Sequence, residues 1–225
     1  MRRFFEEQLD QLRTNIIKMG SLVEEQIEFA IRALDEQNME LARIVIERDS
    51  KVDEYDNLID GQCERIFAMT QPVAIDLRLL MSALKMNNEL ERIGDIAKNI
   101  AERVESLLDY ADLVHNSRIL EMASAARRMV KNAIDSFVNN DPHLARGVCV
   151  DDDRVDDLNL EIFRLLVDQM KRDPVMIEPA AHLMILARHI ERFADHATNI
   201  AEDVIFLVDA KIIKHHAEQE NPPSM

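Results

Sequence analysis

Glycine, proline and aromatic residues are scarce in this chain. Its 225 residues include four Gly, six Pro, two Tyr and no Trp. Residues that break helices or favour strands are therefore few, whereas Leu, Ile, Ala, Met, Glu and Arg are abundant. A hydrophobic fraction of 47% is enough for a globular core. We predict an all-α fold.

Cysteine and positive charge are also scarce. The two cysteines, Cys63 and Cys149, are in neither a CxxC nor a zinc-type spacing, which excludes a disulfide scaffold. The formal net charge of -16 argues against binding to nucleic acid or to an anionic lipid surface. No apolar run is long enough for a membrane span, and the start of the chain does not have the pattern of a signal peptide. We predict a cytoplasmic protein without direct membrane insertion, whose partners are cations or basic protein surfaces.

One polar segment occurs twice. Residues Glu91–Glu102 read ERIGDIAKNIAE, and Glu191–Glu202 read ERFADHATNIAE. A second repeated segment precedes each of them: Asp49–Asp53 recurs as Asp152–Asp156. The offset between these two copies is 103 residues, whereas the offset between Glu91–Glu102 and Glu191–Glu202 is 100. Short insertions or deletions near one turn account for the difference. The period is too long for a short-motif solenoid and indicates the duplication of a domain.

Apolar residues at helical spacing predict three long helices in each copy. In the first copy they cover about 4–36, the stretch from a turn at Gln37–Asn38 to about 69, and about 74–108. The pattern breaks between 109 and 117 and then repeats. We therefore predict two tandem pseudo-symmetric three-helix bundles with six long helices, at 1–112 and 113–213, followed by a disordered tail at 214–225.

Acidic residues are expected to meet across a helix pair in each unit. The second and third helices of a unit are joined by a tight turn at a proline, so they should pack antiparallel. Counted along the sequence, this turn lies midway between the two acids of each of two pairs. The midpoint is Pro72 in the first unit and lies beside Pro174 in the second. Paired acids are therefore level with one another: Asp49 with Asp95, Asp53 with Glu91, Asp152 with Asp195, and Asp156 with Glu191.

Four carboxylates at this range repel one another by a few kcal/mol per close pair, on the order expected at an effective dielectric near 20. Such a cluster needs protons, basic neighbours or a bound cation. Carboxylate oxygens are the ligands that hard divalent metal ions prefer, so the eight acids are candidate metal ligands. Asn99 and Asn199 lie on the same stripe and are possible additional ligands. Helical phasing puts the acids away from the apolar core, in a groove open to solvent.

Three readings of these acids remain open. They can hold metal in a regulatory adaptor without catalytic activity, they can serve a carboxylate-bridged metal hydrolase or oxidase, or they can be solvated helix faces of a metal-independent scaffold. The Glu-x-x-His motif of ferritin-like di-iron enzymes does not occur in the sequence. The outward direction of the acids also leaves a reactive intermediate open to water, which favours the adaptor over the enzyme.

The sequence resembles the PhoU family of phosphate-signalling regulators from about 4 to 211. The resemblance is carried by Glu91–Glu102 and Glu191–Glu202, which look like the family's third and sixth helices, and by Asp49–Asp53 and Asp152–Asp156, which look like its second- and fifth-helix motifs. It implies a cytoplasmic homodimer that binds clusters of divalent metal on the bundle surface. Iron is the first choice, with zinc, manganese and magnesium as alternatives. It also implies a negative regulator of the phosphate-starvation response that contacts the ATPase subunit of the phosphate ABC transporter and a sensor histidine kinase.

Overall fold

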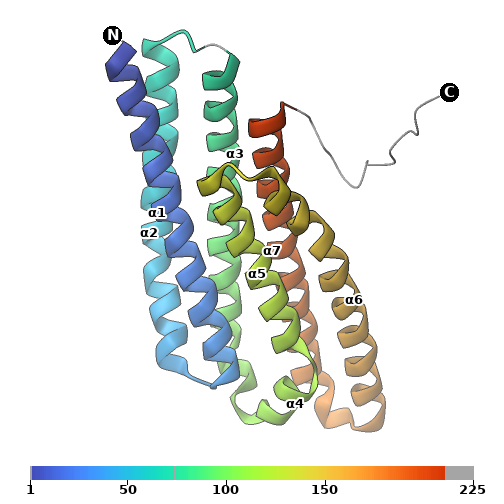
Figure 1. The fold of residues 1–225 in the computed structure, drawn as a ribbon. Coiled ribbons are helices and arrows are strands. Elements are labelled where there is room, and N and C mark those ends of the chain that lie inside the picture. The colour runs from blue at the N-terminus through green and yellow to red at the C-terminus, as the bar shows by residue number, and fades with distance from the viewer. Residues whose placement is uncertain (1, 73, 211–225) are drawn as a thin grey trace, which may run out of the picture.

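The computed structural model describes residues 2–72 and 74–210, and it confirms the all-α prediction, since these residues contain no strand. Six long helices run roughly parallel to one axis, and one short helix and two 3-10 turns connect them (Figure 1). The predicted tail at 214–225 lies outside the described residues. The elements are α1 Arg2–Asp35, α2 Met39–Met69, α3 Ala74–Arg103, η1 Glu105–Tyr110, α4 Ala111–Asn116, α5 Ile119–Asn139, α6 Pro142–Arg172, η2 Pro174–Met176 and α7 Ile177–Asp209.

The turn before α2 and the turn before α6 use the same local chemistry. Gln37 and Asn140 have positive φ angles of 53° and 50°, a left-handed conformation in which the preceding helix ends. Asn38 then caps α2 by accepting hydrogen bonds from the next helical N–H groups, and Asp141 caps α6 in the same way. The two caps are 103 residues apart, so the duplication extends to the helix ends.

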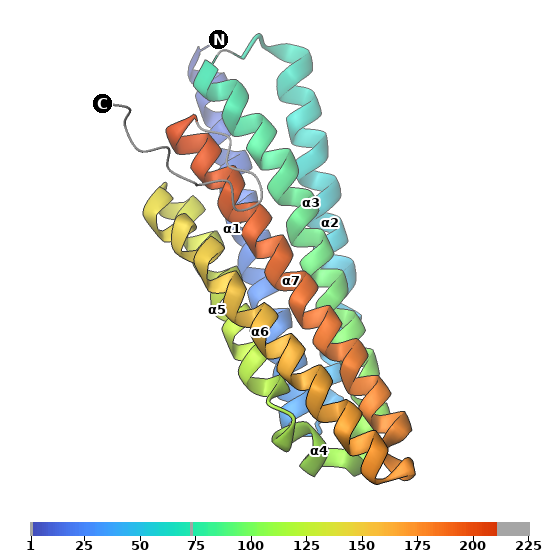
Figure 2. The ribbon, with the colours of Figure 1, turned by 90° about the vertical axis from the view of Figure 1, so that its right-hand side faces the viewer.

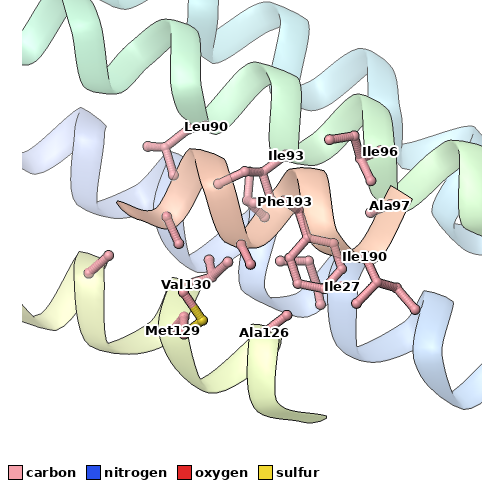
Figure 3. Close-up of a cluster of buried hydrophobic side chains, with 14 of the residues drawn as sticks. Ile27, Leu90, Ile93, Ile96, Ala97, Ala126, Met129, Val130, Ile190 and Phe193 are labelled. Atoms are coloured by element: carbon pink, nitrogen blue, oxygen red, sulfur yellow. The ribbon is translucent and has the colours of Figure 1, made fainter. Parts of the chain in front are cut away.

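The two three-helix units share one core. Helices α3 and α7 pack side by side at the centre of the molecule, and α1 also contacts α5 across the same boundary (Figures 1 and 2). Phe193 of α7 is fully buried among Ile27 of α1, Ile93 of α3 and Met129 of α5, so four helices from both units meet around it (Figure 3). Gly20 lets α1 approach α5 closely, because a Cβ there would lie 3.1 Å from Ile134.

The segment between the units is helical where the sequence pattern predicts a break. Helix α3 ends at Arg103, five residues before its predicted end, and η1 and α4 together cover 105–116. The reason is local burial, because Leu107 and Val114 insert into the core from this connection. The predicted domain boundary between 112 and 113 falls inside α4 and stays a prediction.

None of the described helices is long and apolar enough to cross a membrane.

Candidate metal-binding surface

The hairpin of α2 and α3 carries the first group of predicted ligands. The two helices run antiparallel, and their register is fixed by contacts such as the 2.6 Å bond from Lys98 Nζ to Asp49 Oδ2. Glu91 is partly buried, which raises the pKa of its carboxyl group, and the negative charges of Asp95 and Asp53 raise it further. Asp53 of α2 and Asp95 of α3 therefore lie near enough to Glu91 to act on it electrostatically.

Asp49 differs from the other acids of this hairpin because it is buried and bound. Its side chain is only 8% exposed, whereas Asp53 and Asp95 are exposed. The hydrogen bond and the charge of Asp49 raise the pKa of Lys98, and the charges of Glu102 and Asp95 add to the effect. Lys98 is thus the basic neighbour that offsets the negative charge of the first group.

The hairpin of α6 and α7 carries the second group. Burial raises the pKa of Glu191, and the carboxylates of Asp195 and Asp156 raise it further, against the lowering effect of Arg188. Burial and the charge of Asp156 raise the pKa of Asp195 in the same way. Asp152 lies about one turn before Asp156 on α6. Burial, then the charges of Glu202 and Asp152, raise the pKa of the Cys149 thiol to about 11.

Each group has its own basic residue. Arg188 forms an ion pair with Glu191, whose side chain is 14% exposed, and Asn88 stands at the corresponding position of the first unit. Conversely, Thr198 stands where the first unit has Lys98. In the first unit, the basic residue that offsets the acidic pattern follows Glu91 and Asp95 on α3. In the second unit, it precedes Glu191 on α7. The duplicated sites are alike in their acids and different in their counter-ions.

Sequence reasoning missed an acidic extension of the first group. Asp56 and Asp60 of α2 both accept hydrogen bonds from the fully buried Asn87 of α3, at 2.7 and 3.0 Å. Burial and the charges of Asp60 and Asp53 raise the pKa of Asp56. The i, i+4 spacing of Asp56 and Asp60 repeats that of Asp49 and Asp53 and was a usable signal.

The two asparagines proposed as additional ligands are both half-buried. Asn199 donates a hydrogen bond of 3.1 Å to Glu89 of α3, and His196 contacts the same carboxylate at 2.6 Å. These two bonds lower the pKa of Glu89, although its burial acts in the opposite direction. Asn199 therefore connects the two units here, and a ligand role for it and for Asn99 stays a prediction.

The donor set fits a hard divalent cation in residue type, since both helices of each hairpin contribute carboxylates. Among residues 2–72 and 74–210, however, no three His, Cys, Asp or Glu side chains converge closely enough to hold an ion. Lys98 and Arg188 occupy the carboxylates of Asp49 and Glu191 instead. Metal binding at the eight predicted acids thus requires side-chain rotation and the displacement of these two cations, and it stays a prediction.

Comparisons with known proteins agree with this duplicated architecture. A family model described as the PhoU domain matches residues 16–104 and again 119–204. The chain is 40% identical over 213 residues to a protein of Aquifex aeolicus named phosphate-specific transport system accessory protein PhoU homolog, covering 95% of this chain and 96% of that one. It is 36% identical to the protein of that name from Pseudomonas aeruginosa, covering 94% of this chain and 88% of that one.

Solved structures show the same fold. The crystal structure of PhoU from Pseudomonas aeruginosa superposes with a TM-score of 0.86 at 36% identity, covering 92% of this chain and all of that one. The phosphate transport system regulatory protein PhoU from Streptococcus pneumoniae superposes with a TM-score of 0.86 at 24% identity, covering 94% of this chain and all of that one. Both copies of the family's domain and nearly the whole length of its members are present, so this chain belongs to the PhoU family.

Proposed function

We propose that this protein is a metal-binding regulator of phosphate uptake and of the phosphate-starvation response. Relatives of matching length are named as accessory proteins of the phosphate-specific transport system, which supports an accessory role in phosphate transport. The chain is accordingly a regulatory accessory protein and not an enzyme. We further propose that it acts as a negative regulator, with bound metal and through specific protein partners.

The observation that carries the metal proposal is the effect of neighbouring carboxylates on Glu91 and Glu191. Both are partly buried and have raised pKa values, to which burial contributes most, and the charges of Asp95 and Asp195, respectively, add to the shifts. A fold that holds like charges together stores unfavourable electrostatic energy, which a bound cation offsets. Acids that served only for solubility would not need to lie within electrostatic range of one another in both hairpins.

The ligands of the proposed ions are the eight acids already named. A divalent ion supplies positive charge that several carboxylates share, and the proposed ion is iron first, with zinc, manganese or magnesium as alternatives. Asp49 and Glu191 are the two acids that exchange a side-chain cation for the metal. The chain's own contribution is to hold the acids level and to provide Lys98 and Arg188 as counter-charges while metal is absent.

The proposed partners are the ATPase subunit of the phosphate ABC transporter and its sensor histidine kinase, contacted in the cytoplasm by a homodimer of this chain. A charge of -16 and the exposed carboxylates of Asp53, Asp95, Asp156 and Asp195 support contact with basic protein surfaces. The regulator represses the starvation response when phosphate is plentiful, and metal loading changes the charge of the surface that a partner meets.

A pull-down from the native host, with and without phosphate in the medium, tests the partner proposal. We expect the transporter ATPase or the kinase to be recovered in a phosphate-dependent manner. The matched variants are Glu91→Gln with Glu191→Gln, which remove one acid from each group, and Glu64→Gln, which changes an exposed acid of α2 outside both groups. Recovery of neither protein under both conditions, with the chain folded, would contradict the adaptor proposal.

A further inference from the structure

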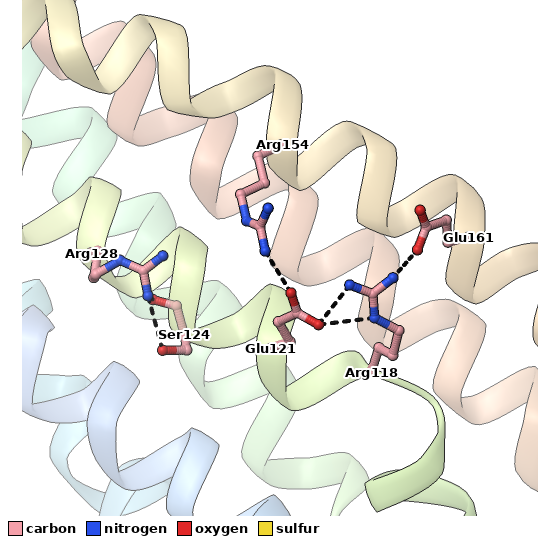
Figure 4. A network of polar contacts seen from close by, with 6 residues as sticks. All are labelled: Arg118, Glu121, Ser124, Arg128, Arg154 and Glu161. Carbon is pink, nitrogen blue, oxygen red and sulfur yellow. Dashed lines mark hydrogen bonds and ion pairs between the residues drawn. The ribbon is translucent and has the colours of Figure 1, made fainter.

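Helix α6 presents two different flanks. One flank is tied to α5, where Arg118 bonds Glu121 and Glu161 and where Arg154 donates a 2.6 Å bond to Glu121 (Figure 4). The opposite flank, toward α7, carries the acids Asp152 and Asp156. The outer surface along this second flank is not occupied by any other described helix.

Apolar side chains continue the acidic stripe of this second flank. Phe163 follows Asp156 by seven residues and so lies on the same stripe of α6, and Leu160 lies beside it. Their side chains are 53% and 49% exposed. On α7, Ile177 is 52% exposed and lies near the stripe of Glu191, fourteen residues before it.

Met170 and Met184 are partly buried. By the register expected for two antiparallel helices that turn beside Pro174, Met184 is level with Phe163 and Met170 with Ile177. We call the combined surface the α6–α7 strip. Its apolar half is made by Leu160, Phe163, Met170, Ile177 and Met184, and its acidic half by Asp152, Asp156, Glu191 and Asp195.

The first unit does not repeat the central part of this apolar half. At the same offset of 103, Asn57 and Asp60 stand where the second unit has Leu160 and Phe163. Asp60 is bonded to the buried Asn87, so the acidic surface of the first hairpin continues where that of the second becomes apolar. A solvent-exposed Phe and Leu cost solubility without adding to the core, which is typical of a contact surface for another molecule.

Charge complementarity decides what can cover the strip. Two basic residues of α7 lie beside its acidic half: Arg188, which Glu191 already holds, and Arg192, whose charge lowers the pKa of Asp195. The four acids of the strip outnumber them. A second copy would bring the same acids and a net charge of -16, whereas a basic amphipathic helix offers both an apolar face and cations. Phe163 and Asp156 are separated by two helical turns, about 10 Å at 1.5 Å per residue.

We propose that the α6–α7 strip is the docking surface for an amphipathic helix of a partner protein, with apolar anchors over Leu160 and Phe163 and with Lys or Arg about two turns away over Asp156 and Glu191. The proposal rests on the proposed adaptor function for its need of a partner. It adds the face, the chemistry of the partner segment, and a difference between the two units.

The test uses the purified full-length protein without metal or phosphate, so its result is independent of both. Fluorescence anisotropy measures the binding of a labelled 18-residue helical peptide with Leu on one face and Lys two turns beyond it. We expect binding that weakens with salt, and a loss of at least about tenfold in affinity for Phe163→Asp with Leu160→Asn, because aromatic anchors dominate such contacts. These two changes install residues that the first unit already has.

The matched control changes two exposed apolar residues of the first hairpin, Leu58→Asn and Met81→Gln, each 46% exposed in the native chain. We expect the control variant to bind the peptide as the native protein does, and a peptide with Glu in place of Lys to bind neither. Equal losses in both variants, equal binding of the Glu peptide, or no binding to the native protein would overturn the proposal. The proposed metal regulation would stand in each of these cases.

Discussion

Replacing Lys98 with methionine separates the two roles that the first acidic group is proposed to have. The substitution keeps the length of the side chain and removes the ammonium group that lies 2.6 Å from Asp49. Leaving a fully buried charge without its ion-pair partner costs about 3–5 kcal/mol, whereas breaking an exposed ion pair costs about 0.2–1 kcal/mol. Asp49 is 8% exposed but Lys98 is 35% exposed. We therefore expect an intermediate loss of about 1–2 kcal/mol in metal-free protein.

Differential scanning calorimetry in the presence of a chelator measures this loss. For a chain of this size, about 1–2 kcal/mol corresponds to a decrease of roughly 2–8 °C in Tm. Saturating Mn²⁺ should then raise the Tm of Lys98→Met by more than it raises that of the native protein, because the metal no longer competes with Lys98 for Asp49. Arg188→Gln is the matched control in the second unit, where the 65% exposed arginine should cost less than about 1 kcal/mol. A metal-free Tm unchanged by Lys98→Met, or an equal metal response in both proteins, would refute this reasoning.

Three further perturbations address the pH response, the shared core and the contact between the units. Because the folded state raises the pKa of Glu91 and Glu191 above the ordinary value of 4.5, their contribution to stability is present below that value and is lost as pH rises through the raised pKa. Tm in chelator should therefore increase as pH falls from 7 toward 4.5, and less so in Glu91→Gln with Glu191→Gln. Parallel curves for the two proteins would contradict the assignment. Phe193→Ala should cost about 3–5 kcal/mol in urea unfolding, since it empties the point where four helices meet; a loss below about 1 kcal/mol would show that the two units do not share this core. Gly20→Leu should cost about 1–3 kcal/mol by overpacking α1 against Ile134, and a neutral result in the same assay would show that the helices can separate there without loss.

The sequence alone predicts much of the fold because its signals are local. Apolar spacing predicts the long helices, and the turn at Gln37–Asn38 was expected from its residue types. The level placement of acids follows from antiparallel packing about Pro72 and needs no information from elsewhere in the chain. The predicted end of α3 at about 108 was wrong. The helix ends at Arg103, and the next residues form η1, from which Leu107 is buried in the core.

The counter-ions and the contact between the two units could not be predicted in this way. Lys98 was one of several basic residues near the acids, and only side-chain geometry identifies it as the partner of Asp49. The bonds of Glu89 to His196 and Asn199 join residues more than one hundred positions apart. Periodicity indicates which face of a helix is apolar, but it does not specify which of several apolar faces from two similar units will meet.

The most direct test of the central claim is elemental analysis of protein purified without chelator, before and after Asp95→Ala with Asp195→Ala. These two changes remove one exposed acid from each hairpin and leave the buried core untouched. The account predicts stoichiometric iron, zinc, manganese or magnesium in each three-helix unit of the native protein and a clear loss of metal in the variant. Metal-free native protein that does not take up a divalent ion on titration, or an unchanged metal content in a folded variant, would contradict it.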